Sequence, residues 1–263
     1  MPRPEVVFRT SAIIIRRYEY GEADRLLTLF TPDQGKIRVI AKGVRKPTAK
    51  MAGHLELYSK VNLLIRRGRD LHRIEQAEQV QPYQPQRESL IWFGYAAYLV
   101  ELLDRFSEDE EPNPPLFGLL DIALNWLSAP DSDYALVARY YELRLLRLTG
   151  FEPSLFRCAV GQEEIEAQAQ YFSPLDGGVV CPDHVRGHAA IPLSLNALKI
   201  LRYAQTRDFD KVRALQISAP MHHLLERIMH SYIAHLLETR LKSADFLHLI
   251  ERFREAPQIP PSP

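Results

Sequence analysis

The hydrophobic period of the chain changes near Pro82 and Pro85, and this change constrains the fold more than any other feature. Before it, apolar residues come in short runs rich in β-branched side chains, and Thr31–Gly35 has the composition of a tight turn. After it, apolar residues recur at helical spacing from 88 to 106. The pattern predicts an α+β protein, with a strand-rich N-terminal domain followed by a helical one.

The first part predicts several short strands with little helical pattern between them. The first is expected to end at Arg16 and Arg17, and 24–30 and 36–42 are expected to pair as a hairpin across the turn. A second pair is expected at 61–65 and 71–80. Short strands at this spacing favour a small closed barrel or a sandwich.

The second part predicts helices at 88–106, 116–127, about 131–149 and 194–242, the last broken near Arg207 and Pro220. Asp131 or Ser132 is expected to cap the third helix. The acidic stretch 108–111 is interpreted as a solvated connector. The domains are then 1–80 and 81–255, with a loop-and-hairpin insert at 151–192 and a disordered Pro-rich tail at 256–263.

Composition places the chain among globular proteins, with 46% hydrophobic and 25% charged residues. No apolar run has the roughly 18 residues that a membrane span needs. The N-terminus lacks a basic segment followed by an apolar one, so we expect a cytoplasmic protein. The two cysteines, Cys158 and Cys181, are expected to stay reduced there.

The charge of the chain is unevenly distributed along its length. Residues 1–80 contain 16 Lys and Arg and 9 Asp and Glu, a net charge of +7, and the rest of the neutral chain carries −7. A basic N-terminal part indicates a polyanionic partner such as nucleic acid. A solubilising surface of uneven charge is the alternative interpretation.

The segment Lys36–Lys42 carries the most specific charge pattern. Side chains alternate across a strand, so Lys36, Arg38 and Lys42 should share one face while Ile37 and its neighbours at 39 and 41 point inward. The following loop adds three more cations. The candidate DNA-binding residues are Arg38, Lys42, Arg45, Lys46 and Lys50. The second choices are Lys36, Arg16 and Arg17. Four nearby aromatic residues are candidates for stacking on bases or for the core, with Phe30 assigned to the core: Tyr18, Tyr20, Phe30 and Tyr58.

An ordered set of short motifs extends over most of the chain. It consists of Tyr20-Gly-Glu22, Asp24-Arg25, Leu29-Phe-Thr31, Gly35-Lys36, Ala41-Lys-Gly43-Val-Arg45, Leu175-Asp-Gly-Gly-Val-Val-Cys181, Arg240-Leu-Lys-Ser243 and Phe246-Leu247. This ordered set resembles the RecO family. The resemblance implies an OB-fold barrel followed by a helical domain, which in some members carries a small zinc-binding insert.

The resemblance also implies a non-enzymatic mediator of DNA repair and recombination, associated with the nucleoid. Such a protein binds single- and double-stranded DNA, anneals complementary strands and helps to load the RecA recombinase onto strands coated by single-stranded-DNA-binding protein. The implied partners are RecR, the acidic C-terminal tail of the coating protein and, in some bacteria, RecF. For that tail the sequence offers four candidate arginines without choosing among them: Arg139, Arg144, Arg147 and Arg202.

The insert is compared with the zinc-containing members, which hold the metal with two Cys-x-x-Cys-like knuckles. Here the first knuckle reads Cys158-Ala-Val-Gly161 and the second reads Cys181-Pro-Asp-His184, so one ligand is missing. A structural zinc site is normally closed by four ligands, and His188 is a candidate to complete it. A hairpin that has lost its metal is the alternative.

Other interpretations remain open at this point. A generic RNA-binding module would carry the same charge pattern, and an enzyme could use a zinc ion in the insert for catalysis. The histidines near Glu226 lack the His-Glu-x-x-His pattern of zinc hydrolases, so we interpret them as a polar helix face. The chain has no P-loop or dinucleotide-binding motif, so the sequence gives no support for ATP use.

Overall fold

The computed structural model describes residues 6–69, 71–83, 89–187 and 189–255, and side chains as far as residue 250. The expected disordered tail and His188 lie outside these residues. Two compact units are present. The first contains Met1–Ala96 and Leu103–Ala129, and the second contains Ala97–Leu102 and Pro130–Pro263. The expected domain boundary at residue 80 stays a prediction. The unit that contains the strands also contains a helical hairpin, so the compact units do not test a boundary along the sequence.

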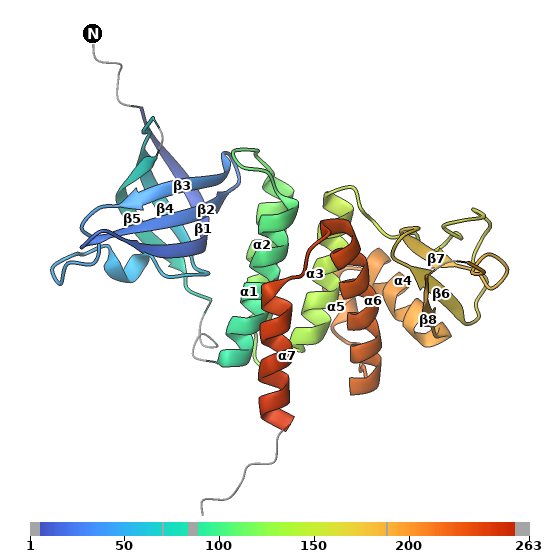
Figure 1. Cartoon of the computed structure of the whole chain (residues 1–263). Coiled ribbons are helices and arrows are strands. Elements are labelled where there is room, and N and C mark those ends of the chain that lie inside the picture. Colours follow the sequence, from blue (N-terminus) through green and yellow to red (C-terminus); the bar gives the residue numbers. More distant parts are fainter. Residues whose placement is uncertain (1–5, 70, 84–88, 188, 256–263) are drawn as a thin grey trace, which may run out of the picture. The chain divides into compact units, whose positions relative to one another are not determined.

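The first unit is built on a closed five-stranded barrel in the order β1-β2-β3-β5-β4 (Figure 1). Its strands are β1 (Val7–Tyr20), β2 (Asp24–Thr31), β3 (Gly35–Ala41), β4 (Lys60–Arg66) and β5 (His72–Gln81). β1 pairs with both β2 and β4 and so closes the sheet. All pairs are antiparallel except β3 with β5. This is the five-stranded Greek-key barrel of an OB-fold, and the predicted fold class is confirmed.

Strand alternation fills the barrel with branched aliphatic side chains. The registers place Ile14 beside Leu29 and Leu29 beside Ile37, and all three are buried in the barrel core. Because successive side chains point to opposite faces, the intervening residues are left to the outside of the barrel.

β1 is longer than the sequence predicted, so the expected end at Arg16 and Arg17 was wrong. A register shift between Ile14 and Arg16 adds one residue to the strand, and pairing with β2 then continues to Tyr20 opposite Asp24. Such a bulge leaves the extra residue unpaired but lets the ladder resume beyond it. The β1–β2 hairpin therefore carries polar and aromatic residues that the sequence had placed in a loop.

A helical hairpin completes the first unit. It is formed by the ends of α1 (Leu90–Phe106) and by α2 (Pro114–Leu127), which Asn113 caps through a hydrogen bond to the Leu116 N–H. The acidic loop 108–111 between them, expected to be a solvated connector, instead contacts β3. The Glu110 N–H donates to the Lys36 carbonyl at 3.0 Å, because glycine at position 35 leaves room for the Glu111 backbone.

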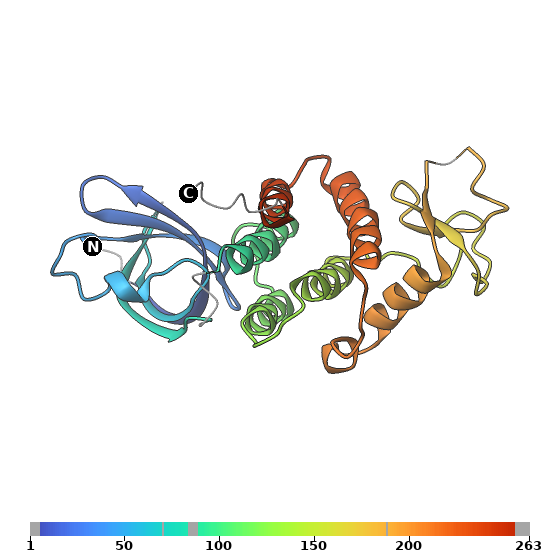
Figure 2. The same cartoon turned by 90° about the horizontal axis from the view of Figure 1, so that it is seen from below.

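The second unit is mainly helical. It contains α3 (Tyr134–Leu148), α4 (Leu195–Thr206), α5 (Phe209–Val212), α6 (Ala219–Leu237) and α7 (Lys242–Glu255). α3, α4 and α6 pack against one another (Figures 1 and 2). Asp133, rather than the predicted Asp131 or Ser132, caps α3. Glu101 accepts hydrogen bonds from the first N–H groups of α7. Within the described ranges, no helix is long and apolar enough to cross a membrane.

The insert lies within the second unit. β6 (Gln170–Ser173) pairs with β7 (Gly178–Val180) on one side and with β8 (Ile191–Leu193) on the other. Gly177 has a φ of 73°, which only glycine adopts readily, and it turns the chain between β6 and β7. The segment 154–165 packs beside this small sheet through Ser154, whose backbone exchanges hydrogen bonds with residues 177 and 179.

Candidate nucleic-acid interface and metal site

The outward side chains of β1, β2, β3 and β5 form one face of the barrel, called the outer face below. The registers place Tyr18 beside Leu26, Leu26 beside Ile40 and Ile40 beside Arg73. Residues two positions away along each strand join the same face. Its members are Arg16, Tyr18, Tyr20, Asp24, Leu26, Thr28, Arg38, Ile40, Lys42 and Arg73, and the register continues it to Phe30 and Lys36.

Two tyrosines are presented to solvent on the outer face. Tyr18 is 56% exposed and Tyr20 is 54% exposed. Phe30 and Tyr58 are buried instead, so the assignment of Phe30 to the core is confirmed, and Tyr58 packs on the Phe93 ring. An exposed aromatic ring on an OB-fold sheet is a platform on which bases stack. Of the four candidate aromatic residues, two therefore remain available to a nucleic acid.

Lys36 points outward as predicted, but it does not contribute to an exposed surface. Its side chain is only 11% exposed, and its ammonium donates to the main-chain oxygens of Asp104 and Ser107, each at 2.9 Å. The carboxylates of Asp104 and Asp109 lie at 3.2 and 3.3 Å. Arg16 also pairs with Asp104. A cation at the C-terminal end of α1 satisfies carbonyls that lack a helical partner, so Lys36 is part of the internal structure of this unit.

Lys42 remains on the outer face but is held by a carboxylate. Its ammonium lies 2.8 Å from Asp24, while half of its side chain is exposed. Asp24 also accepts a hydrogen bond from the Gly43 N–H at 2.7 Å. These two bonds, led by the one from Lys42, lower the pKa of Asp24. The pair orients Lys42 and reduces the positive charge that it offers to a phosphate.

Arg45 and Arg17 are also engaged by acidic neighbours. Arg45 lies 2.9 Å from Glu19 and donates to the main-chain oxygens of residues 21 and 22, so it ties the loop after β3 to the turn of the β1–β2 hairpin. Arg17 lies 2.6 Å from Glu56. Glu19 and Arg17 alternate with the tyrosines along β1, so these pairs lie on the side of the hairpin opposite to the outer face.

The remaining candidate cations are the most available ones. Arg38 has a side chain that is 70% exposed, and its only ion-pair partner in the described ranges is Asp109, at 3.9 Å. For Lys46 and Lys50 the described part of the chain contains no ion pair. The run at 36–50 is therefore not one continuous cationic surface. It separates into a structural end at Lys36 and an accessible part at Arg38, Lys42, Lys46 and Lys50.

A second cluster of chemically active side chains lies in the insert. The donor atoms of Cys158, Glu163, Cys181 and His184 all lie within 4.8 Å of one another. His184 Nδ1 lies 3.8 Å from the Cys158 sulfur and 3.1 Å from the Cys181 sulfur, and Glu163 Oε1 lies 2.9 Å from both His184 Nδ1 and the Cys181 sulfur. A tetrahedral zinc ion with bonds of about 2.0–2.3 Å spaces its ligands by roughly 3.3–3.8 Å. The distance between His184 and Cys158 fits this spacing, and the other three are shorter, so the four groups form a metal-binding arrangement once small side-chain rotations move them apart.

Comparisons with known proteins agree with this architecture. The family model for the N-terminal domain of recombination protein O matches residues 6–83, and the model for its C-terminal domain matches residues 87–245. The chain belongs to the RecO family. It is 37% identical to the DNA repair protein RecO of Dehalococcoides mccartyi over 93% of this chain and 96% of that protein. It is 39% identical to that of a Roseiflexus species over 92% and 85%, and 34% identical to that of Pelotomaculum thermopropionicum over 95% and 96%.

Sequence reasoning missed two residues that this RecO-family structure brings into the sites. Arg73 reaches the outer face only because β5 pairs in parallel with β3, an arrangement that no local pattern reveals. Glu163 joins the two cysteines because the chain turns back after residue 158. One signal in the sequence could have indicated Glu163. Glycine stands at position 161, where the knuckle pattern has a ligand, and a carboxylate follows two residues later.

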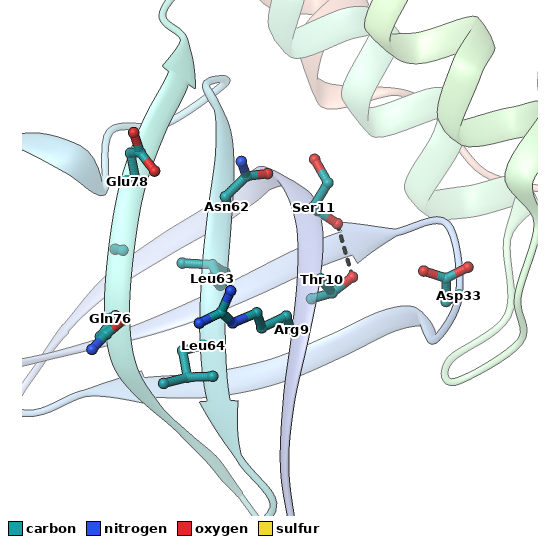
Figure 3. A pocket seen from close by; sticks show the side chains of 10 residues that line it. Arg9, Thr10, Ser11, Asp33, Asn62, Leu63, Leu64, Gln76 and Glu78 are labelled. Carbon is teal, nitrogen blue, oxygen red and sulfur yellow. Dashed lines mark hydrogen bonds between the residues drawn. The ribbon is translucent and has the colours of Figure 1, made fainter.

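On β1, β4 and β5 the RecO barrel carries a separate shallow depression of about 670 Å³. Figure 3 shows side chains that line it, among them Arg9, Asn62, Gln76 and Glu78. Its floor is polar, and Arg9 is its only Lys or Arg, beside two acidic residues. None of the predicted DNA-binding residues lines it. This depression lacks the positive charge that a polyanion requires, and it provides positions for control substitutions.

One histidine of α6 pairs with an acidic residue, and an acidic residue of α6 pairs with a histidine of α7. His222 Nε2 lies 3.1 Å from Asp133, and Glu226 Oε1 lies 2.7 Å from His248 Nε2 on α7. In the described ranges only the insert brings together three or more potential metal ligands. These contacts support the interpretation of a polar helix face in the RecO helical unit.

Proposed function

We propose that this chain binds DNA through the outer face of its barrel and acts as a recombination mediator. One observation carries the proposal, namely that Tyr18 and Tyr20 stand exposed on the same OB-fold face as Arg38 and Lys42. Stacking holds bases without regard to sequence, and the cations contact the phosphates that connect them. Lys46 and Lys50, in the loop after β3, extend the track along the backbone of a single strand.

The proposed mechanism requires no covalent step. Two complementary strands repel each other through their phosphates, and a surface that neutralises part of this charge lowers the repulsion. Bases that stack on two separate rings stay unpaired and accessible until the second strand arrives. Annealing, binding of double-stranded DNA and loading of RecA recombinase onto coated strands are the activities that we propose on this basis.

The DNA interface is tested by charge reversal on the two sides of the barrel. We expect Arg38→Glu to weaken binding of a labelled oligo-dT strand by roughly 10-fold at moderate salt, because a phosphate contact is replaced by a repulsion. Arg9→Glu is the matched control, since Arg9 is also an exposed barrel arginine, on β1, but lines the polar depression (Figure 3). Equal effects of the two substitutions in fluorescence anisotropy would remove the outer face from the proposal.

The mediator activity is tested with complementary oligonucleotides coated by the cognate single-stranded-DNA-binding protein. The wild-type chain should accelerate their annealing, whereas Arg38→Glu should not. RNA oligonucleotides used as competitors distinguish the alternative of a general RNA-binding module. A chain that bound RNA more tightly than DNA and left annealing unchanged would favour that alternative.

For the acidic tail of the coating protein, the second unit offers one suitable surface. A depression of about 620 Å³ has Phe156 and Pro153 in its lining, with Arg147 and Arg157 beside them. Apolar surface with arginines close by fits an acidic peptide that ends in an aromatic residue. Of the other candidates, Arg139 is buried in an ion pair with Glu142, whereas Arg144 and Arg202 donate to main-chain carbonyls.

We therefore propose Arg147 for this contact, and RecR and, in some bacteria, RecF as further partners. A labelled peptide with the tail sequence should bind the wild-type chain and lose most of its affinity on Arg147→Glu. Arg213→Glu, at an exposed position in the same unit, is the control. A peptide that bound all three proteins equally would place the tail elsewhere.

We also propose that the insert takes up a structural zinc ion through Cys158, Cys181 and His184. The ion would hold the segment at 158–163 against the turn after β7. A catalytic zinc is the less favoured alternative. Turnover of a nucleic acid by highly purified protein would support it.

A further inference from the structure

The first knuckle of the insert has the shape of a ligand turn although its second ligand is missing. The Gly161 N–H is directed at the Cys158 sulfur at 3.4 Å, and the Gln162 N–H donates to the Cys158 carbonyl at 2.9 Å. A backbone N–H that points at a sulfur favours its thiolate form, which is the form that binds metal. The turn therefore prepares Cys158 as a ligand without help from position 161.

A side chain at position 161 would compete for space and would not strain the backbone. Gly161 is not among the glycines with positive φ, so a side chain would be tolerated by its backbone. A Cβ atom there would instead overlap the Glu163 carboxylate and the His184 ring. The volume that a ligand at position 161 would fill is thus already occupied, and one of the two occupants is a carboxylate.

The local fold brings Glu163 to this place. The Cys158 N–H donates to the Glu163 carbonyl at 2.8 Å, and Arg157 forms an antiparallel bridge with Glu164. The chain therefore reverses direction between 158 and 163, and Glu163 comes to lie beside Cys158. Its side chain contacts both His184 and Cys181 at 2.9 Å.

We infer that Glu163 is the fourth ligand of a Cys158–Glu163–Cys181–His184 zinc site, in the coordination position that a residue at 161 would otherwise supply. The inference rests on the zinc proposal above and deepens it by replacing the sequence-based candidate His188 with a carboxylate. Two thiolates, one carboxylate and a neutral imidazole give the loaded site a net charge of −1. Cys, His and carboxylate donors are all ordinary zinc ligands.

The experiment measures zinc and cobalt binding by the full-length chain, purified without a metal-chelating tag. With Zn²⁺ alone as the probe, the wild-type chain should bind one equivalent, and Glu163→Ala should lower the affinity on the order of 100-fold. Removal of a group that only hydrogen-bonds to a ligand costs about 10- to 100-fold, so the loss of a ligand should reach at least the upper end of that range. Glu164→Gln and His188→Ala should keep the wild-type affinity. With Co²⁺, the wild-type chain should show a tetrahedral spectrum with the charge-transfer intensity of two thiolates.

A second variant, in which a cysteine is restored at position 161 of the first knuckle, keeps the test decisive if Glu163→Ala alone folds poorly. The double variant Gly161→Cys with Glu163→Ala should bind zinc again and show the charge-transfer intensity of three thiolates. Removal of the carboxylate frees part of the space for the new sulfur, and a small rotation of the half-exposed His184 side chain frees the rest. Wild-type chain that takes up no Zn²⁺ would overturn both the zinc proposal and the inference. Zinc binding that survives Glu163→Ala, or is lost on His188→Ala, would overturn only the assignment of Glu163.

Discussion

The carboxylate of Asp109 lies 3.9 Å from the guanidinium of Arg38, and the same carboxylate lies 3.3 Å from Lys36. Asp109 belongs to the acidic loop between α1 and α2, whose residue 109 forms a bridge with Lys36 at the start of β3. An acidic side chain thus occupies the position where a phosphate would approach the most exposed arginine of the outer face.

We expect Asp109→Asn to strengthen binding of single-stranded DNA by roughly 2- to 5-fold at low salt. The Asp109–Arg38 pair is solvent-exposed, so its removal changes the free energy by no more than about 1 kcal/mol. Glu78→Gln, an identical charge change in the polar depression, should have a smaller effect. Titrations at several salt concentrations check this, since the gain should shrink as salt screens the carboxylate. An unchanged affinity would mean that DNA does not approach Arg38 from this end.

Replacement of the exposed tyrosines should weaken DNA binding in a manner that salt does not affect. We expect Tyr18→Ala and Tyr20→Ala each to cost about 1–3 kcal/mol of binding free energy, the typical contribution of one stacked base. Phenylalanine at either position should retain most of the affinity, because the ring is kept. Affinity measured at high salt separates stacking from charge. Alanine variants that bind as tightly as the phenylalanine variants would contradict a stacking role.

Lys36→Ala should affect folding more than DNA binding. The substitution removes the partner of two main-chain carbonyls and of the Asp104 carboxylate, so we expect unfolding in urea to require about 1–3 kcal/mol less free energy. DNA affinity per folded molecule should fall less than for Arg38→Ala, whose side chain is exposed. A large loss of affinity without loss of stability would return Lys36 to the DNA surface.

Stability should also depend on pH through a buried carboxyl group in the second unit. Burial raises the pKa of Glu142 to about 7, although Arg139 at 2.6 Å opposes the shift, and the Tyr98 hydroxyl donates to the same carboxyl at 2.5 Å. A carboxyl whose pKa is higher in the folded protein stabilises the fold below its unfolded pKa, and this stabilisation is lost as pH rises through about 7.

The wild-type chain should therefore lose stability relative to Glu142→Gln as pH rises from 5 to 8, by up to about 3 kcal/mol. Glutamine keeps the shape and the hydrogen-bond acceptor but does not ionise. Urea unfolding of both proteins at several pH values measures the difference. A difference in stability that stays constant over this range would show that Glu142 is already ionised at pH 5.

Local periodicity accounts for much of the fold. The alternation at 36–42 predicted which side chains point inward, and Ile37, Val39 and Ala41 are indeed buried. The helical spacing after residue 88 is confirmed in the same way. These features follow from the sequence because they depend on residues close together in the chain.

The role of a side chain also depends on which distant segments of the chain contact it. Only the tertiary structure decided these contacts. By itself the sequence determined a strand-rich basic domain, a helical domain and an insert with three candidate metal ligands. It could not show that Asp104 and Ser107 take Lys36 out of the exposed surface, or that parallel pairing adds Arg73 to it. Nor could it show that a chain reversal sets Glu163 beside His184. Charge and alternation are local properties, whereas burial and ion pairing depend on which segments meet when the chain folds.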